Sequence, residues 1–312
     1  MTNLHYDNCL MTLNKVKYQT FFKNEIQKML NTDLYNMLEK NKESFDEFLS
    51  KKKYIYIYHK YKKVSSYILN NKDRFKYKVI IHDPLHCGFS KKERDIADRI
   101  SCWSKNFVIE RIKDNHNKLF TAFYPIVREN VNNVKSDEPY IISVGNLFRD
   151  YNILIKALEG IDIKCIILTD GKFRPIINNN PNITIKNVSQ PEVIKYIKKA
   201  TFGILPLIEN TGRGSLSSQA HGITVAAEFV SCNLPFIASH NMGVDEYLVD
   251  NVFGVTYNVN DVDDLKKKIL YFLDENIQSE YKEKIMNFYE REPNYFSPEH
   301  FVEILEHEFS LS

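Results

Sequence analysis

Apolar strands alternate with helices through the second half of the chain, and this alternation constrains the fold more than any other feature. Short runs rich in Ile, Val and Leu stand at residues 140–144, 164–168, 183–188, 202–205 and 235–238. Helical spacing or turn residues fill the segments between them. Strands that are apolar at every position are buried on both faces, and helical connections join parallel neighbours. The pattern therefore predicts a parallel α/β sheet whose ligands lie at the carboxyl ends of its strands.

The first half of the chain is less regular, but it also mixes helices with strands. Its spacing predicts helices at 18–50, around 64–68 and at 90–101, and strands at 53–59, 77–81 and 107–109. Residues 128–138 are polar and unpatterned, so we place a domain boundary there. We expect one domain at 1–136, a second at 137–290, and a final helix at 291–312 that packs back on the first domain.

Charge is distributed unevenly between these two halves. The chain of 312 residues has a net charge of +2, but residues 1–136 hold 26 basic and 15 acidic side chains, whereas residues 137–312 hold 16 and 25. The first half is therefore +11 and the second −9. A basic half fits an anionic partner such as a membrane surface, a nucleic acid or a phosphorylated acceptor. A solvated lysine-rich surface explains it equally well.

The five cysteines are scattered and form no CxxC pair, which is typical of a reduced protein without structural zinc. The sequence contains no run of about 18 apolar residues, which a transmembrane helix would require. The first residues lack the apolar stretch of a signal peptide. We expect a cytoplasmic protein, and peripheral contact with an anionic membrane through the basic half is compatible with that location.

Residues 211–247 carry the densest chemical signal in the chain. A loop of small residues is followed by a helix that opens at four residues: His221, Gly222, Ile223 and Thr224. The free N–H groups and positive dipole end of such a helix favour an anion. Glu228 follows one turn along, where its carboxylate can accept hydrogen bonds from two ribose hydroxyls, although a surface glutamate that stabilises the dipole is the plainer interpretation. The segment suits a nucleoside diphosphate.

A second candidate lies after the strand at 140–144. Gly145 follows this strand and would let the backbone approach a phosphate, and Arg149 stands four residues on. An arginine at that position can bind a phosphate through two hydrogen bonds. Taken alone, the pair is a weak signal, and an ordinary turn that carries a surface arginine is the favoured interpretation.

Together these motifs resemble glycosyltransferases of the GT-B fold, in particular the large retaining family that includes glycogen synthases and bacterial mannosyl- and lipopolysaccharide transferases. Residues 228–237 (EFVSCNLPFI) match the second half of the family's nucleotide-site pattern, and 238–246 match the turn after it. Residues 251–255 resemble the hairpin that follows, and 143–158 resemble the first strand and helix of the nucleotide domain. The resemblance covers residues 139–275.

The resemblance implies two Rossmann-like domains with the active-site cleft between them: a reduced N-terminal domain that binds the acceptor and a C-terminal domain that binds the nucleotide sugar. Glu228 would bind the ribose of the donor and Arg149 would neutralise its diphosphate. Backbone at Gly145 and at 222–224 would approach phosphate and sugar. The base pocket would be lined by Asp170, Gly171 and Pro206.

One departure from the family concerns the acid that stands eight residues before Glu228, because that position is Ala220 here. Glu209 or His221 is the candidate to replace this acid near the sugar. Arg213, in the same glycine-flanked loop, can add a phosphate contact.

The family also places a histidine at the end of a central strand in its first domain, beside the donor sugar. His82 and Asp83 follow the strand at 77–81 and fit that pattern. Such a polar pair can orient the sugar or the acceptor hydroxyl. Alternatively, Asp83 caps a turn before Pro84.

The sequence thus predicts a glycosyltransferase that moves a sugar from a nucleoside-diphosphate sugar to an acceptor hydroxyl. The family implies retention of configuration, and we expect no cofactor and no metal because positive groups can stabilise the leaving diphosphate. The acceptor stays open between a glycan, a lipid-linked hydroxyl and DNA. Two alternatives also stay open: a non-catalytic nucleotide-sugar binder, which Ala220 favours, and a nucleotide-sugar epimerase, for which the sequence shows no acid/base pair.

Overall fold

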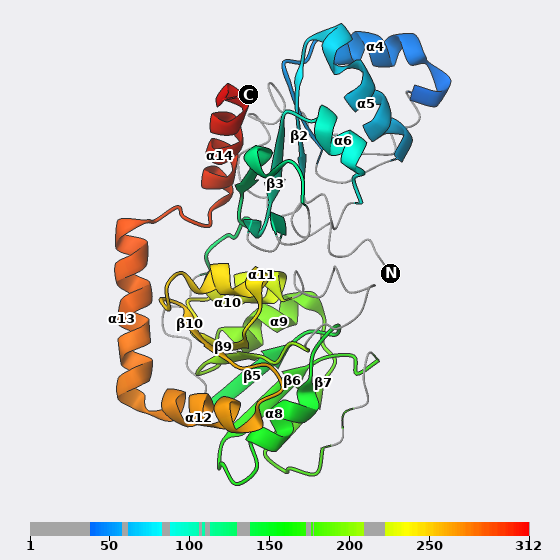
Figure 1. Ribbon diagram of the computed structural model, residues 1–312. Coiled ribbons are helices and arrows are strands. Elements are labelled where there is room, and N and C mark those ends of the chain that lie inside the picture. The colour runs from blue at the N-terminus through cyan, green and yellow to red at the C-terminus, as the bar shows by residue number, and fades with distance from the viewer. Residues whose placement is uncertain are drawn as a thin grey trace. The chain divides into compact units, whose positions relative to one another are not determined.

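The computed structural model describes residues 38–57, 62–82, 88–105, 108–109, 113–129, 138–172, 176, 178–208 and 222–311. These residues form two compact units. Unit 1 comprises the described residues up to Pro125 and those from Pro298 onward, and unit 2 runs from Ile126 to Ser297. Each unit contains one parallel sheet with helices packed against it (Figure 1).

Unit 1 is built on a four-stranded sheet with the strand order β1-β2-β3-β4. The strands are β1 (Tyr54–Ile57), β2 (Lys78–His82), β3 (Arg99–Cys102) and β4 (Leu119–Thr121), and all neighbours are parallel. Its helices before the boundary are α4 (Lys42–Ser50), α5 (Lys62–Phe75), α6 (Lys91–Ile96) and the short η2 (His116–Lys118). The order follows the sequence, because each strand pairs with the next one along the chain.

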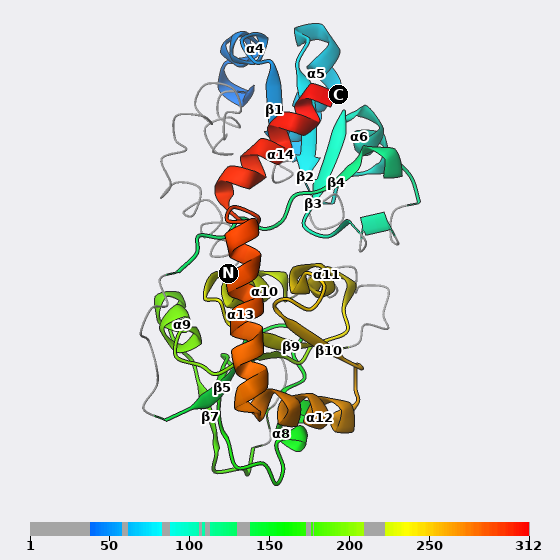
Figure 2. The same cartoon turned by 90° about the vertical axis from the view of Figure 1, so that its left-hand side faces the viewer.

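The last helix, α14 (Pro298–Leu311), belongs to unit 1 although it follows all of unit 2 in sequence. Its residues Phe301, Leu305 and Phe309 are buried in one cluster with Ile80 and Phe120 of the sheet. Figures 1 and 2 show α14 on one face of this sheet and α4, α5 and α6 on the other. The apolar stripe of α14 therefore covers a sheet face that would otherwise be exposed.

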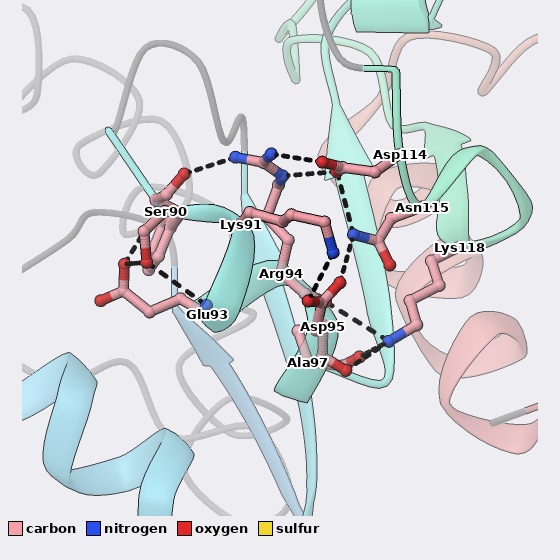
Figure 3. Close-up of polar contacts among 10 residues, drawn as sticks. Ser90, Lys91, Glu93, Arg94, Asp95, Ala97, Asp114, Asn115 and Lys118 are labelled. Carbon is pink, nitrogen blue, oxygen red and sulfur yellow. Dashed lines mark hydrogen bonds and ion pairs between the residues drawn. The ribbon is translucent and has the colours of Figure 1, made fainter.

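A polar network holds α6 against the connection from β3 to β4 (Figure 3). Arg94 donates to both carboxylate oxygens of Asp114 at 3.0 Å, and its third nitrogen donates to the carbonyl of Phe89. Lys118 Nζ donates to three carbonyls at the end of α6 over 2.7–3.3 Å. A lysine that satisfies the last carbonyls of a helix fixes where that helix ends.

Two predictions for this region are wrong. The helix expected at 90–101 ends at Ile96, and its second half is the strand β3, whose residues pair with β2 on one side and β4 on the other. The strand expected at 107–109 is also wrong, because Val108 and Ile109 are helical and Val108 N donates to Ser104 O. In both segments the apolar run is too short for its spacing to distinguish a strand from a helix.

Unit 2 contains a six-stranded parallel sheet with the order β10-β9-β8-β5-β6-β7. The strands are β5 (Tyr140–Val144), β6 (Lys164–Leu168), β7 (Ile183–Lys186), β8 (Gly203–Leu205), β9 (Phe236–Ser239) and β10 (Gly254–Tyr257). The chain builds outward from β5 to β7 and then returns to β8 on the other side of β5. The strand order therefore reverses between β5 and β8, which is where ligands of open α/β sheets bind.

Helices cover both faces of this sheet. They are α8 (Tyr151–Ala157), α9 (Gln190–Ile197), α10 (Ile223–Ser231), α11 (Met242–Asp245), η3 (Glu246–Leu248), α12 (Val262–Leu273) and α13 (Glu275–Arg291). Figure 1 shows α8 and α12 below the sheet and α9 and α10 above it. Strand residues such as Ile141, Ile204 and Ile237 are fully buried between these layers. The strands predicted in this half agree with those observed to within a residue or two.

Two features of unit 2 differ from expectation. Residues 251–255 do not form a hairpin, because β10 pairs in parallel with β9 after a turn in which Val249, Asp250 and Asn251 have positive φ. The helix α13, of 17 residues, has no counterpart in the sequence analysis. Charged residues of both signs are interspersed along α13, so the apolar stripe of Tyr281, Ile285 and Phe288 that it buries is not evident from the sequence.

Candidate functional site

The residues expected to bind a nucleotide gather at the carboxyl edge of the unit 2 sheet. The loops after β5 and β8 meet there, and an isolated antiparallel bridge joins Arg149 to Leu207. Asp150 N donates to Pro206 O at 2.7 Å and Ile208 N donates to Phe148 O at 3.1 Å. These bonds tie together the two loops that flank the reversal of strand order.

Arg149 is almost fully buried in this loop, with 4% of its surface exposed. Its Nε donates to Val144 O at 3.1 Å and its Nη1 donates to Leu147 O at 3.0 Å. The guanidinium lies flat against Gly145, where an added Cβ would be 2.8 Å from Nη2. Gly145 has a φ of +129°. Only glycine fits this position, because a side chain would be strained and would also displace the arginine.

Two opposing effects act on the buried guanidinium. Burial lowers the pKa of Arg149, while the nearby charges of Tyr151 and Glu228 act to raise it. Glu228, on α10, is half-buried, and its negative charge favours the protonated form of Arg149. The residues proposed for the diphosphate and for the ribose therefore influence each other electrostatically although they are distant in sequence.

The start of α10 lies against the loop after β8. Gly222 precedes the helix with a φ of +98°, and as a glycine it has no side chain with which to cap the helix. A Cβ at Gly222 would come within 3.2 Å of Leu207 and 3.1 Å of Val244. Ile223 is buried and Thr224 is half-buried. The first N–H groups of α10 therefore belong to the same edge as Arg149 and are not satisfied by an N-cap side chain.

A side chain that the sequence analysis did not single out joins the loops after β5 and β6. Asn146 Oδ1 accepts a hydrogen bond from Asp170 N at 2.8 Å and another from Thr169 Oγ1 at 3.2 Å. Thr169 Oγ1 in turn accepts from Gly171 N at 3.2 Å. This network fixes the loop that holds the predicted base-pocket residues, Asp170 and Gly171. An asparagine directly after a strand-end glycine was the available signal.

His82, predicted for the sugar or acceptor, lies in unit 1 at the carboxyl end of β2. It is 1% exposed, and its Nδ1 is 2.9 Å from Ser101 Oγ. Aromatic rings surround it, with centroids at 6.0 Å for Tyr56 and 5.0 Å for Trp103. A hydroxyl on one nitrogen and rings at its edges hold the imidazole in one orientation.

Four predicted residues lie outside the described parts of the chain: Asp83, Glu209, Arg213 and His221. Within the described residues, no group of three or more His, Cys, Asp or Glu side chains is placed to hold a metal ion. In the same part of the chain, no helix is long and apolar enough to cross a membrane.

A shallow hollow of about 840 Å³ lies elsewhere in unit 2. It is lined by residues 152, 155 and 156 of α8, by residues 159–162 before β6 and by residues 179–182 before β7. It is therefore at the amino ends of these strands, opposite the edge that carries Arg149 and Glu228. Parallel sheets bind ligands at the carboxyl ends of their strands, so we do not assign the nucleotide to this hollow.

Known proteins resemble this chain in sequence. The profile of the family described as Glycosyl transferases group 1 matches residues 128–291. An uncharacterised glycosyltransferase of Methanocaldococcus jannaschii is 27% identical over 194 residues, which cover 58% of this chain and 51% of that relative. The chain thus spans about half the length of this curated relative.

Solved structures resemble it in fold. A glycosyltransferase from Rickettsia africae superposes with a TM-score of 0.61 at 15% identity, covering 91% of this chain and 82% of that one. Anabaena HepE, solved in complex with UDP-glucose, gives a TM-score of 0.59 at 12% identity and covers 96% and 95%. At such identities the likeness concerns the fold alone. It confirms the expected fold class, an α/β chain with two Rossmann-like sheets of the GT-B type.

Proposed function

Because the chain belongs to the glycosyl transferases group 1 family, we propose that it transfers a sugar from a nucleoside-diphosphate sugar to an acceptor hydroxyl. The observation that carries the proposal is the buried Arg149 at the reversal of strand order in unit 2, where it is under the electrostatic influence of Glu228. A buried cation and a nearby carboxylate match the two ends of a ribose diphosphate.

The donor would lie along the carboxyl edge of the sheet. Its diphosphate would face Arg149 and the start of α10 at Gly222, and its ribose hydroxyls would donate to Glu228. The base would occupy the space beside Asp170, Gly171 and Pro206. HepE, which has the same fold, was solved with UDP-glucose, so this nucleotide sugar is the first donor to test.

We also propose that the reaction needs no metal and retains the anomeric configuration. The first part is supported by the positive groups at the site, since the Arg149 guanidinium and the N–H groups of α10 can stabilise the charge of the departing diphosphate. Preorganised donors of this kind need no rearrangement as charge develops. Retention rests on the resemblance to retaining transferases described above.

The acceptor remains a choice between a glycan, a lipid-linked hydroxyl and DNA. The excess of lysine and arginine in residues 1–136 supports an acceptor that carries or adjoins negative charge. Anionic vesicles, a DNA duplex and neutral oligosaccharides would separate these cases, because binding to the first two falls with increasing salt whereas neutral sugars bind independently of salt.

The test of the donor site is a thermal-shift panel with UDP-, GDP-, ADP- and CMP-sugars in the presence of a chelator. Stabilisation by one nucleotide sugar is expected, and Glu228→Gln should abolish most of it. Glu283→Gln is the matched control, because Glu283 is an exposed glutamate on α13. Loss of the shift in both variants, or in neither, would contradict the role of Glu228.

Release of free nucleotide then separates an enzyme from a binder. A transferase hydrolyses or transfers the bound donor slowly, whereas a binding protein returns it intact. Turnover in the presence of the chelator supports transferase activity and its independence of metal. Stabilisation without turnover under any acceptor would favour the non-catalytic alternative, which the alanine at position 220 already suggests.

A further inference from the structure

The turn between β9 and α11 holds an exposed histidine in a fixed orientation. His240 Nδ1 is 2.8 Å from Asp245 Oδ2, and the imidazole side chain is 68% exposed whereas the carboxylate is 26% exposed. The other carboxylate oxygen of Asp245 accepts from Asn241 N at 3.1 Å. An exposed side chain is normally mobile, so an imidazole held by a half-buried carboxylate is unusual for a surface position.

The backbone of this turn is equally constrained. His240 N donates to Tyr257 O at 2.8 Å, at the end of β10. Asn241 is buried, and its Oδ1 accepts from Gly243 N at 3.0 Å. Burial raises the pKa of Asp245, while the backbone N–H of Asn241 and the neighbouring imidazole act to lower it. The turn therefore presents one polar side chain to solvent and satisfies the others internally.

Direct contacts join this turn to the proposed donor site. Ser239 Oγ, one residue before His240, donates to Leu207 O at 3.1 Å and accepts from Leu207 N at 2.9 Å. Leu207 is the bridge partner of Arg149 and lies against Gly222 at the start of α10. Val244, one residue before Asp245, also lies against Gly222. Figure 1 shows α10 and α11 side by side at one end of unit 2.

We propose that His240, oriented by Asp245, is a further donor-binding residue that contacts the terminal phosphate of the nucleoside diphosphate. This inference rests on the proposed function, because it assumes that the donor lies at the carboxyl edge of the unit 2 sheet. With Nδ1 engaged by Asp245, Nε2 is the nitrogen left for a ligand. A phosphate oxygen is the ligand atom that suits this Nε2, because the protonated imidazole donates from both nitrogens: Nδ1 to Asp245 and Nε2 to the phosphate.

A second pair of a histidine and a carboxylate, on α14, provides a control for the His240–Asp245 pair. His300 and Glu303 lie one turn apart on α14, with 3.4 Å between Nδ1 and Oε2, and their side chains are 37% and 66% exposed. Neither side chain is buried, and the pair belongs to unit 1. His300→Ala is therefore a control for the removal of an exposed histidine from an ion pair.

The test measures the affinity for a nucleoside diphosphate and for the corresponding monophosphate. The probes are UDP and UMP, with GDP and GMP as a second set, and the set whose diphosphate stabilises the wild type is used. His240→Ala should weaken diphosphate binding about 10-fold and monophosphate binding less than about 2-fold, because only the terminal phosphate loses a charged hydrogen bond. Asp245→Asn should act in the same direction by about 3-fold, since it frees the imidazole without removing it.

The outcomes distinguish this inference from the proposed function. His300→Ala should change neither affinity. Equal loss of UDP and UMP binding in His240→Ala would show a structural role and overturn the inference, and so would unchanged UDP binding. If no nucleotide binds the wild-type protein, the proposed function itself is refuted and the inference falls with it.

Discussion

Replacement of Gly145 by alanine is the most stringent test of how the donor site is built. The residue has a φ of +129°, and an added Cβ would lie 2.8 Å from Nη2 and 2.9 Å from Nε of Arg149. Restoring the 3.4 Å of ordinary contact requires the guanidinium to move by about 0.6 Å. Its bonds to Val144 O and Leu147 O are already 3.1 and 3.0 Å long, so a shift of this size breaks or weakens both.

The expected cost has two parts. Backbone strain in a conformation reserved for glycine costs about 1–3 kcal/mol. Loss of at least one hydrogen bond from a buried charged group costs about 1.5–3 kcal/mol. We therefore expect Gly145→Ala to lower the free energy of unfolding of unit 2 by about 3–5 kcal/mol and to abolish donor binding, because Arg149 no longer occupies its position.

Gly160→Ala is the control, because Gly160 has a φ of +75° but nothing within 4 Å of an added Cβ. It should cost only about 1 kcal/mol of backbone strain. For a domain of this size the difference corresponds to a melting temperature lower by about 5 °C or more in Gly145→Ala than in the control. Thermal unfolding followed by far-UV circular dichroism measures both variants.

A double-mutant cycle identifies the clash partner. If the clash is with the guanidinium, Gly145→Ala and Arg149→Met together should cost less than the sum of the single changes, by about 1 kcal/mol or more. Strict additivity, or a Gly145→Ala protein as stable as the control, would refute the packing of Arg149 on Gly145 as the reason for the glycine.

Three further predictions concern other parts of the chain. Gly254→Ala would place a Cβ 1.8 Å from Phe236 O, so it should prevent β10 from pairing with β9 and yield insoluble protein. Soluble expression at the wild-type level would contradict the close approach of Gly254 to the backbone of Phe236. Glu308→Gln removes the half-buried ion-pair partner that Arg99 of β3 has on α14, and it should destabilise unit 1 by about 1–3 kcal/mol. Fluorescence of the single tryptophan during urea unfolding measures this change, and an unchanged midpoint of unfolding would refute a stabilising role of the pair. The guanidinium of Arg94 lowers the pKa of the Asp114 carboxyl below 3.8. The ion pair therefore stabilises unit 1 above this pH, and this stabilisation is lost as the pH falls through the lower pKa of the folded state. Asp114→Asn should therefore flatten the acid limb of unit 1 stability, and an acid limb as steep as that of the wild type would count against the assignment.

The agreement between sequence and structure is best in unit 2, and the reason is local. Its inner strands are short runs of mostly apolar residues, and several helices begin at side chains that cap them, such as Asp150, which accepts from Ile153 N, and Ser189, which forms a capping box with Glu192. Such signals depend on residues a few positions apart, so they can be read without knowing the fold. The same is true of the strand-end glycine at 145.

Unit 1 was harder to predict because its short segments satisfy more than one pattern. Residues 99–102 (RISC) continue the helical spacing of apolar residues in the charged helix before them. They nevertheless form β3, because strands on both sides pair with them. Lys118 ends the preceding helix from 20 or more residues away, by donating to carbonyls of Arg94, Asp95 and Ala97. Neither cause is visible in the local sequence.

The sequence by itself determined that this chain is an α/β protein, where its unit 2 strands end, and that Gly145 and Arg149 follow one of those ends. It determined these because hydrophobic periodicity and backbone preferences act over a few residues. Only the tertiary structure decided the strand order, the burial of Arg149 against Gly145, the link from Asn146 to Asp170, and the pairing of His240 with Asp245. Those features depend on which distant segments pack together, and that choice is made by the whole core rather than by any one segment.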